Sequence, residues 1–337
     1  VKGQGAIGVY MKKKGLILLS GGLDSTLAAE VMLEQGIELE AINFSLIFHT
    51  TAGWAKRVAE RLSIKYRSVD ITGEYLDILK NPKHGYGSNI NPCIDCRIHM
   101  LKIAKACMKD MGASFVVTGE VLGERPMSQH LNNLNLIERE SGLKGLIVRP
   151  LSAKLLEPSL PEIEGVIDRE RLLNIQGRSR KPQISLAGKY NIGDYPAPAG
   201  GCLLTDERFT ERLKDLMANG DLTIEKIELL KLGRHFRLGR DTRLIVGRNE
   251  AENESLSGKA IDGDIFFEPK TVPGPTGLLR GSDISPDQIE RAASIISRYS
   301  DRTGDTVMIE WREHPKEGVK ETAAPPAHEE ELKEMRI

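Results

Sequence analysis

Residues 15–25 read Gly15-Leu-Ile-Leu-Leu-Ser20-Gly21-Gly22-Leu23-Asp24-Ser25, and this stretch decides the fold of the amino-terminal part of the chain. An apolar run of strand length leads into a turn that contains two glycines. From Ser25 to Glu34 apolar residues then recur at helical spacing. A strand, a glycine turn and a helix in this order begin a β-α-β unit.

The same alternation continues downstream. Strands are predicted at 40–45, 65–70, 114–118 and 146–149, and helices at 54–62 and 97–111. This pattern predicts an α/β fold with a doubly wound parallel sheet. The stretch Asn81 to Pro92 is rich in Gly, Asn and Pro, interrupts the alternation, and is predicted to be a long functional loop. Two more helices, at 167–175 and 207–217, complete the predicted first domain.

A chain of 337 residues exceeds what one hydrophobic core usually organises, which favours two domains. The composition shifts after Asn219-Gly220, and residues 226–248 carry seven Lys or Arg against two acids. We predict an upstream extension at 1–10, a first domain at 11–217 and a smaller α+β domain at 218–312. The second domain should have strands near 242–246 and 307–311 and a helix near 286–298. Residues 313–337 are highly charged and are predicted to form a disordered tail.

The overall composition is that of an ordinary globular protein, with 40% hydrophobic and 28% charged residues. The 47 Lys and Arg nearly balance the 48 Asp and Glu, so any basic surface must be local. No run of about 18 apolar residues is present, which excludes a transmembrane helix. The first ten residues lack the features of a secretory signal, so a cytoplasmic location is expected.

The glycine turn has the composition of a phosphate-binding loop. Gly21 and Gly22 let the backbone approach a phosphate closely, and the following helix N-terminus supplies positive potential. Ser20 and Ser25 add hydroxyl donors. Asp24 would repel phosphate oxygens and is better suited to hold Mg²⁺ or to orient the loop. The alternative is a tight turn with an ordinary helix N-cap.

The six residues from Ser20 to Ser25 resemble the SGGxDS loop of the N-type ATP pyrophosphatases (PP-loop enzymes). Members of that superfamily adenylate an oxygen of their substrate and release pyrophosphate, after which a nucleophile displaces AMP. The resemblance therefore implies ATP as cosubstrate and the same reaction course for this chain.

Three of the four cysteines are candidates for a shared site. Cys93 and Cys96 form a C-x-x-C pair ahead of the predicted helix 97–111, and Cys202 follows a Gly-rich turn much later in the chain. Such thiols are compatible with zinc, with an iron-sulfur cluster or with redox chemistry. Cys107 lies eleven residues after Cys96, about 16 Å along one helix, and is interpreted as a core residue. A fourth ligand from His99 or His130 would close a zinc site, whereas three cysteines leave one iron of a [4Fe-4S] cluster open.

The cysteine motifs also resemble those of the tRNA thiouridylases of the MnmA, ThiI and TtuA type. The similar segments are Asn91-Pro92-Cys93-Ile-Asp-Cys96, Thr118-Gly119-Glu120 and Gly200-Gly201-Cys202. Cys93 stands where the MnmA pattern has Asp, which moves the likeness toward the iron-sulfur-dependent enzymes. Glu120 stands where that pattern has His, which leaves the role of this position open. Gly119 is expected in the nucleotide site.

The carboxy-terminal part resembles an NFACT-R segment, which is associated with RNA binding, at Lys231-Leu-Gly-Arg-His-Phe-Arg237 and Ile245-Val-Gly-Arg-Asn-Glu250. Basic side chains there would contact RNA phosphates without regard to base sequence. The alternative is a solvated basic strand face. Arg125 and Gln129, in the first domain, are candidates for nucleotide or RNA contact or members of a solvated loop. The RNA-binding candidates are Lys231, Arg234, Arg237, Arg240, Arg243 and Arg248.

Together these features predict an ATP- and Mg²⁺-dependent tRNA sulfurtransferase. The catalytic candidates are Cys93, Cys96, Cys202 and Asp24, and sulfur would arrive either on a [4Fe-4S] cluster held by the three thiols or as a persulfide on Cys202 with Cys96 as resolving thiol. The expected partners are tRNA and a sulfur donor, either sulfide or a sulfur carrier or desulfurase, and a homodimer is compatible with the sequence. Two rivals remain: a superfamily member that acts on a small molecule, and a non-enzymatic RNA-binding protein with a structural metal.

Overall fold

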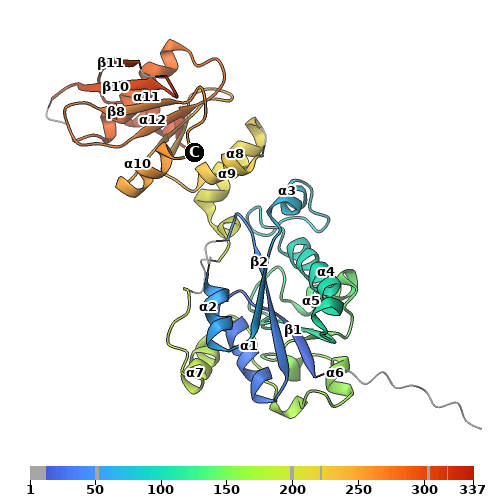
Figure 1. Cartoon of the computed structure of the whole chain (residues 1–337). Helices are drawn as coiled ribbons and strands as arrows, with labels where there is room; N and C mark the ends of the chain where they lie inside the picture. The colour runs from blue at the N-terminus through green and yellow to red at the C-terminus, as the bar shows by residue number, and fades with distance from the viewer. Residues whose placement is uncertain (1–12, 50–52, 198–200, 221, 302–303, 317) are drawn as a thin grey trace, which may run out of the picture. The chain divides into compact units, whose positions relative to one another are not determined.

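The structure is a computed structural model that describes residues 13–49, 53–197, 201–220, 222–301, 304–316 and 318–337. The chain forms two compact units, Val1–Thr205 and Asp206–Ile337 (Figure 1). The boundary therefore falls twelve residues before the predicted one, between 205 and 206 in place of 217 and 218. The predicted extension at 1–10 lies outside the described residues.

The first unit is built on a five-stranded sheet in which every pairing is parallel and the strand order is β3-β2-β1-β4-β5. Helices α1, α2 and α7 lie on one side of the sheet and α4 and α5 on the other (Figure 1). This arrangement confirms the predicted doubly wound α/β fold. The strands are β1 (Lys14–Leu18), β2 (Glu38–Ser45), β3 (Lys65–Asp70), β4 (Phe115–Val117) and β5 (Ile147–Val148).

Seven described helices belong to the first unit, and α8 (Glu207–Asn219) opens the second. The seven are α1 (Leu23–Glu34), α2 (Trp54–Arg61), α3 (Thr72–Lys80), α4 (Cys93–Met111), α5 (Leu131–Ser141), α6 (Leu160–Ile163) and α7 (Lys181–Lys189). Short 3-10 turns occur at Ala153–Leu155, Arg169–Arg171 and Leu203–Thr205.

Helix α1 is buried along most of its length because small residues let it approach the sheet closely. Ala28 and Ala29 are fully buried, and even Ser25 and Thr26 in its first turn are inaccessible. The core on this side combines α1, α2 and α7 with the apolar residues of β1 and β2. The glycine turn at the start of α1 is thus held on a rigid framework.

Two sequence predictions in the first unit are wrong, and one helix was not predicted. Helix α4 begins at Cys93 and not at residue 97, so the C-x-x-C pair forms the first turn of the helix. The predicted helix at 167–175 is a 3-10 turn within an extended segment, because Leu173 and Ile175 donate backbone hydrogen bonds to Pro150 and Leu151. Helix α7 follows this segment and carries no clear helical signal of its own.

The second unit contains a six-stranded antiparallel sheet with the order β11-β10-β8-β9-β7-β6. Helices α11 and α12 pack on one core and α9 and α10 on a second, smaller one. This confirms the α+β prediction. The elements are α9 (Ile224–Leu230), β6 (Arg234–Arg237), β7 (Arg243–Val246), α10 (Glu250–Ser257), β8 (Ile265–Pro269), β9 (Gly277–Arg280), α11 (Pro286–Tyr299), β10 (Val307–Glu313), β11 (Val319–Ala324) and α12 (Glu329–Met335).

The predicted disordered tail is an integral part of this unit. Strand β11 pairs along its whole length with β10, and Leu332 of α12 is buried in the core. The prediction of disorder was wrong because it rested on the charged composition of residues 313–337. Their charged side chains lie on the solvent side of β11 and α12, and each of these elements buries only a few apolar residues. Helix α8 likewise belongs here, since Asp215 pairs with Arg237 and Arg243.

Candidate functional site

The glycine turn connects β1 to α1 at the carboxyl edge of the parallel sheet, where ligands of open α/β sheets bind. Gly21 has a φ of 78°, and a Cβ atom at this position would lie 2.5 Å from the backbone of Trp54 and Ala55. Gly119 follows β4, and a Cβ there would lie 2.5 Å from the Ser25 nitrogen. Only glycine fits at either position.

Gly22 differs from its neighbours because its side-chain direction is open. A Cβ atom would meet nothing closer than the Ser20 hydroxyl at 3.4 Å, and its φ of −74° is ordinary. Gly22 is also the N-cap of α1, and no side chain caps the helix there. The first amides of α1 are therefore free of side-chain caps beside open space, as an anion site requires.

The two serines of the turn brace it internally. The Oγ atoms of Ser20 and Ser25 are 3.1 Å apart. Gly22 donates its backbone N–H to Ser20 at 3.3 Å, and the Ser25 hydroxyl donates to the Gly22 carbonyl at 3.0 Å. These bonds fix the backbone that was predicted to cradle a phosphate.

Asp24, in the first turn of α1, is the acidic group of this site. Burial raises the pKa of its carboxyl, and the nearby charges of Arg180 and Arg125 and the amide of Gln183 oppose this rise. Its Oδ1 atom is buried and has no hydrogen-bond partner. One free carboxylate oxygen next to a phosphate site fits Mg²⁺, which proteins commonly bind through one or two carboxylates together with substrate phosphates.

Arg180 and Gln183 were not found by sequence reasoning. They lie at the start of α7, beyond the motifs, and only the packing of α7 against α1 brings them to the turn. Gln129, which was a candidate for ligand contact, is buried and accepts the Arg125 backbone N–H at 3.0 Å. It shapes the loop that carries Arg125.

The three candidate cysteines gather in the first unit. Residues 48–49, beyond the end of β2, hold the Cys202 segment through a bridge from His49 to Cys202 and a 2.9 Å bond from Leu203 N to Phe48 O. Cys96 accepts a hydrogen bond from the buried hydroxyl of Tyr75 in α3. Cys93 and Cys202 both lie close enough to Cys96 to raise its pKa, and all three thiols raise the pKa of Tyr75.

Burial dominates the acidity of two of these thiols. It raises the pKa of Cys96 to about 12, against the opposing charge of Arg97, and with the neighbouring thiol of Cys93 it raises the pKa of Cys202 to about 11. Because both pKa values lie well above 7, both are neutral thiols at neutral pH. Only the thiolate is a nucleophile or a metal ligand, so each must lose its proton before it reacts. A low-pKa thiol was expected, and for these two the structure shows the opposite.

Cys93 has a different environment. The Asn91 amide donates a hydrogen bond to its sulfur at 3.2 Å, and the Asn91 carbonyl accepts the backbone N–H of Gly87. The loop is further fixed by His84, whose ring and backbone both bond to Asp95 at 2.9 Å. The predicted long loop is thus ordered around the thiols.

The thiols as arranged do not form a metal site. Within the described parts of the chain, no group of three His, Cys, Asp or Glu side chains is placed to hold a metal ion. His99 lies on α4 with a buried, unpaired Nε2 atom, and His130 is the N-cap of α5. In the described chain, neither forms such a group with the thiols.

Glu120 is buried and paired with two arginines. It is 1% exposed and pairs with Arg149 at 2.9 Å and with Arg97 at 3.2 Å, and it accepts the Thr118 hydroxyl. Although burial acts to raise its pKa, the two guanidinium groups outweigh it and the pKa of Glu120 is lowered. Glu120 is thus an anion that holds Arg97, the residue next to Cys96.

Most basic side chains of the predicted RNA-binding segment have a partner within the second unit. Asp215 pairs with both Arg237 and Arg243, and burial lowers the pKa of Arg243 to about 10. Lys231 pairs with Glu228 and Arg248 with Glu252. Arg234 lies over the Tyr299 ring at 4.7 Å. Of the six candidates, Arg240 is exposed and has no ion-pair partner in the described chain.

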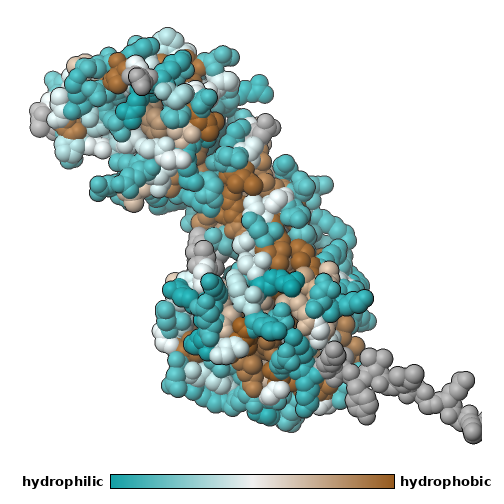
Figure 2. Space-filling model, in the orientation of Figure 1, coloured by the Kyte–Doolittle hydropathy of each residue, from teal (hydrophilic) through white to brown (hydrophobic). Residues whose placement is uncertain are grey.

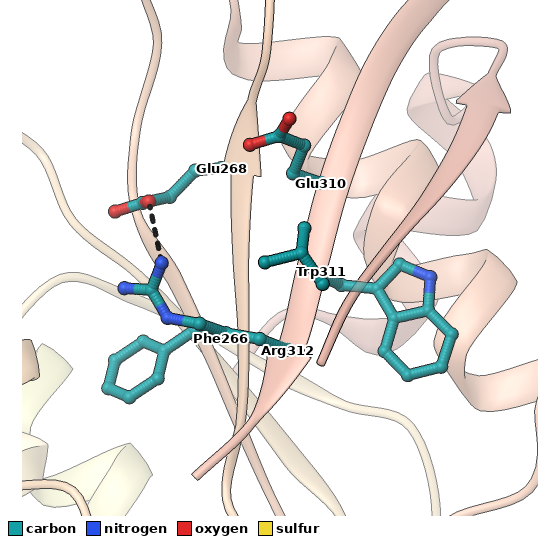
Figure 3. A pocket seen from close by; sticks show the side chains of 6 residues that line it. Phe266, Glu268, Glu310, Trp311 and Arg312 are labelled. Carbon is teal, nitrogen blue, oxygen red and sulfur yellow. Dashed lines mark ion pairs between the residues drawn. The ribbon is translucent and has the colours of Figure 1, made fainter. Parts of the chain in front are cut away.

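A shallow pocket lies on the β8-β10-β11 face of the second unit (Figure 3). Its lining includes Glu268 and Glu310, and Arg312 is paired with Glu268 at 3.8 Å. The side chain of Trp311 extends away from Phe266 and Arg312. Lys270 pairs with Glu310 at 3.2 Å, so both carboxylates of the lining already have a basic partner.

Hydrophilic side chains cover most of the face seen in Figure 2, with smaller apolar patches between them. Of the helices that the structure describes, none combines the length and apolar character needed to cross a bilayer.

Family models match both units. Residues 10–154 match the family described as thiamine biosynthesis protein (ThiI), and residues 233–336 match the NFACT protein RNA binding domain. The chain therefore joins a ThiI-type PP-loop domain to an NFACT-R domain, which confirms both resemblances predicted from the motifs.

Curated relatives match the first unit. The "Probable tRNA sulfurtransferase" of Finegoldia magna is 32% identical over 161 residues, which are 45% of this chain and 39% of the relative. That of Lysinibacillus sphaericus is 32% identical over 159 residues, 45% of this chain and 37% of the relative. This chain spans about two fifths of the length of these relatives. A solved 4-thiouridine synthetase–RNA complex with bound ATP is 21% identical with a TM-score of 0.34, covering 53% of this chain and 51% of that one.

Proposed function

We propose that this protein is an ATP-dependent tRNA sulfurtransferase that makes a thiouridine. The observation that carries the proposal is the placement of two chemistries at one edge of one sheet. The glycine turn follows β1, the Cys202 segment is held beyond β2, and Gly119 and Glu120 follow β4. Carboxyl ends of parallel strands share an edge, so nucleotide and thiols face the same substrate region.

The first step is adenylation at the glycine turn. The uridine oxygen attacks the α-phosphorus of ATP, and pyrophosphate leaves. The amides at the start of α1 and the open side of Gly22 would bind the phosphates. Asp24 would hold Mg²⁺, which neutralises phosphate charge when bound.

The second step is sulfur transfer. A sulfur donor supplies a sulfane sulfur as a persulfide on Cys202, whose terminal sulfur attacks the adenylated carbon so that AMP leaves. Cys96 then attacks the inner sulfur of Cys202, which releases the thiocarbonyl product and forms a Cys96–Cys202 disulfide. An external thiol reductant restores both thiols. Both thiols lie in the first unit, on α4 and on the segment that residues 48–49 hold, and this placement supports the pairing.

The alternative sulfur route is a [4Fe-4S] cluster on Cys93, Cys96 and Cys202. It would require the thiols to move into a ligating arrangement and to ionise. Anaerobic iron and sulfide analysis of the purified protein, alongside thiolation assays, separates the two routes. Iron that tracks activity across Ser variants of the three cysteines would support the cluster, and full activity without iron would support the persulfide.

RNA binding is proposed for the second unit, supported by its family match. The test of the whole proposal is tRNA-dependent release of pyrophosphate followed by thiouridine detection after nuclease digestion. We expect Cys202→Ser to stop thiolation while pyrophosphate release continues, and Cys107→Ser to behave as wild type. Sulfur transfer to a small acceptor without tRNA would favour the small-molecule rival, and RNA binding with no turnover would contradict the enzyme proposal.

A further inference from the structure

Three polar side chains lie buried and unsatisfied beside the glycine turn. Gln183 is fully buried with its amide beside the Asp24 carboxyl, and neither its Nε2 nor its Oε1 atom makes a hydrogen bond of full geometry. Asp24 Oδ1 and Arg180 Nε are also buried without partners. Buried polar atoms are almost always paired, because leaving them unpaired costs stability. Their convergence at one place points to a ligand that pairs them.

Two segments that are distant in the sequence bring Arg125 and Arg180 to the glycine turn. Gly177 donates its N–H to the Leu122 carbonyl at 2.7 Å, and Leu122 forms a parallel bridge with Gln176. Ser152 ties the same segments together, since its hydroxyl accepts the Leu122 N–H at 2.9 Å and donates to the Ile175 carbonyl at 2.6 Å. Arg125, three residues after Leu122, and Arg180, four residues after Gln176, are thereby held on one side of Asp24.

The charges around Asp24 are close but not in contact. Arg180 and Arg125 both act on the Asp24 carboxyl, yet neither forms an ion pair with it within the described residues. Arginine is the residue best suited to bind phosphate, because its guanidinium presents several donors in a fixed plane. Within the described residues, the two guanidinium groups form no ion pair and lie beside the carboxyls of Asp24 and Glu124, an arrangement that suits a phosphate chain carrying a metal ion.

We propose that Arg125 and Arg180 bind the phosphate groups of the nucleotide opposite the glycine turn, and that the Gln183 amide donates to the same ligand. This inference rests on the proposed nucleotide site and extends it to α7, beyond the residues 10–154 that match the family model. The ligand is the triphosphate of a nucleotide, so both ATP and inorganic pyrophosphate should bind.

The test measures the affinity of the full chain for ATP with Mg²⁺ and for inorganic pyrophosphate by titration calorimetry. Arg180→Ala and Arg125→Ala should each weaken both affinities about tenfold or more, as expected for loss of a charge-assisted hydrogen bond. Arg178→Ala is the matched control, because Arg178 is exposed in the same segment. Its affinities should stay within about twofold of wild type.

Gln183→Leu separates a ligand-binding role from a structural one. Leucine has a similar volume and removes two unpaired buried polar atoms, so the melting temperature should rise while ATP affinity falls. A lower melting temperature with unchanged ATP affinity would show that Gln183 is structural and would overturn its assignment. Failure of the wild-type protein to bind ATP overturns the proposed function as well, whereas wild-type binding that persists unchanged in both arginine variants overturns this inference alone.

Discussion

Gly119→Ala should disable the nucleotide site from a position that is not in the glycine turn. The added Cβ atom would lie 2.5 Å from the Ser25 nitrogen and 2.6 Å from the Asp24 carbonyl carbon. These are backbone atoms of the first turn of α1, so they cannot rotate away as a flexible side chain would. The first turn of α1, including Asp24, must move, and with it the amides proposed to bind phosphate.

The magnitude follows from overpacking of a rigid core, which costs about 1–3 kcal/mol. For a unit of this size each kcal/mol shifts the melting temperature by about 2–4 °C, so a decrease of about 2–12 °C is expected. Gly22→Ala is the matched control. Its Cβ atom meets only the Ser20 hydroxyl at 3.4 Å, and loss of a glycine N-cap should cost less than about 1 kcal/mol.

Thermal unfolding and ATP titration of the two variants distinguish the positions. Gly119→Ala should lose both stability and ATP affinity. Gly22→Ala should lower the melting temperature by less than about 4 °C. It should still bind ATP more weakly, because its methyl group enters the open side of the turn. The reasoning would be refuted if Gly119→Ala bound ATP as wild type, or if the two variants lost equal stability.

Four other predictions concern the buried thiols of the first unit and the charged residues of the second. Burial holds the pKa of Cys96 at about 12 and of Cys202 at about 11, so their iodoacetamide alkylation should be slow at pH 8 and rise with pH toward 11; fast alkylation of both at pH 7 would contradict this. Because these pKa values are raised above that of an unfolded thiol, about 8.5, the stability of the first unit should fall as pH rises from about 8.5 to 11, in alkaline denaturation scans. In urea unfolding, Asp215→Asn should lower the unfolding free energy of the second unit by about 1.5–3 kcal/mol, because Arg237 and Arg243 lose their shared carboxylate. The control is Asp262→Asn, at an exposed position. In tRNA binding at varied salt, Arg240→Glu should weaken affinity and flatten the salt dependence without a change in melting temperature, and unchanged binding would place RNA recognition elsewhere.

The motif residues were found from the sequence because their signals are local. The strand, glycine turn and helix at 15–34 are specified by apolar spacing and by glycines that sterically exclude other residues. The alternation of strands and helices was sufficient for the parallel sheet, since such crossovers have few allowed topologies. The C-x-x-C pair was found, although its place inside the first turn of α4 was missed.

Only the tertiary structure decided which charged side chains have an ion-pair partner. The basic segment at 226–248 is typical of an RNA-binding surface, yet Asp215 of α8, outside the segment, pairs with two of its arginines and offsets one of their two charges. A charge pattern along the chain does not reveal a partner that arrives through packing. The charged segment at 313–337 was misjudged for the same reason, because strand β11 is stabilised by pairing with β10 and not by its own composition.

The clearest division lies at the nucleotide site itself. The sequence by itself determined the glycine turn and Asp24, whose chemistry depends on neighbours within six residues. Arg180 and Gln183 stand more than 150 residues away, in a helix with no motif, and only the packing of α7 against α1 brings their polar groups to Asp24. Burial and pairing of polar atoms depend on contacts between distant segments, so this half of the site could not be read before the chain was folded.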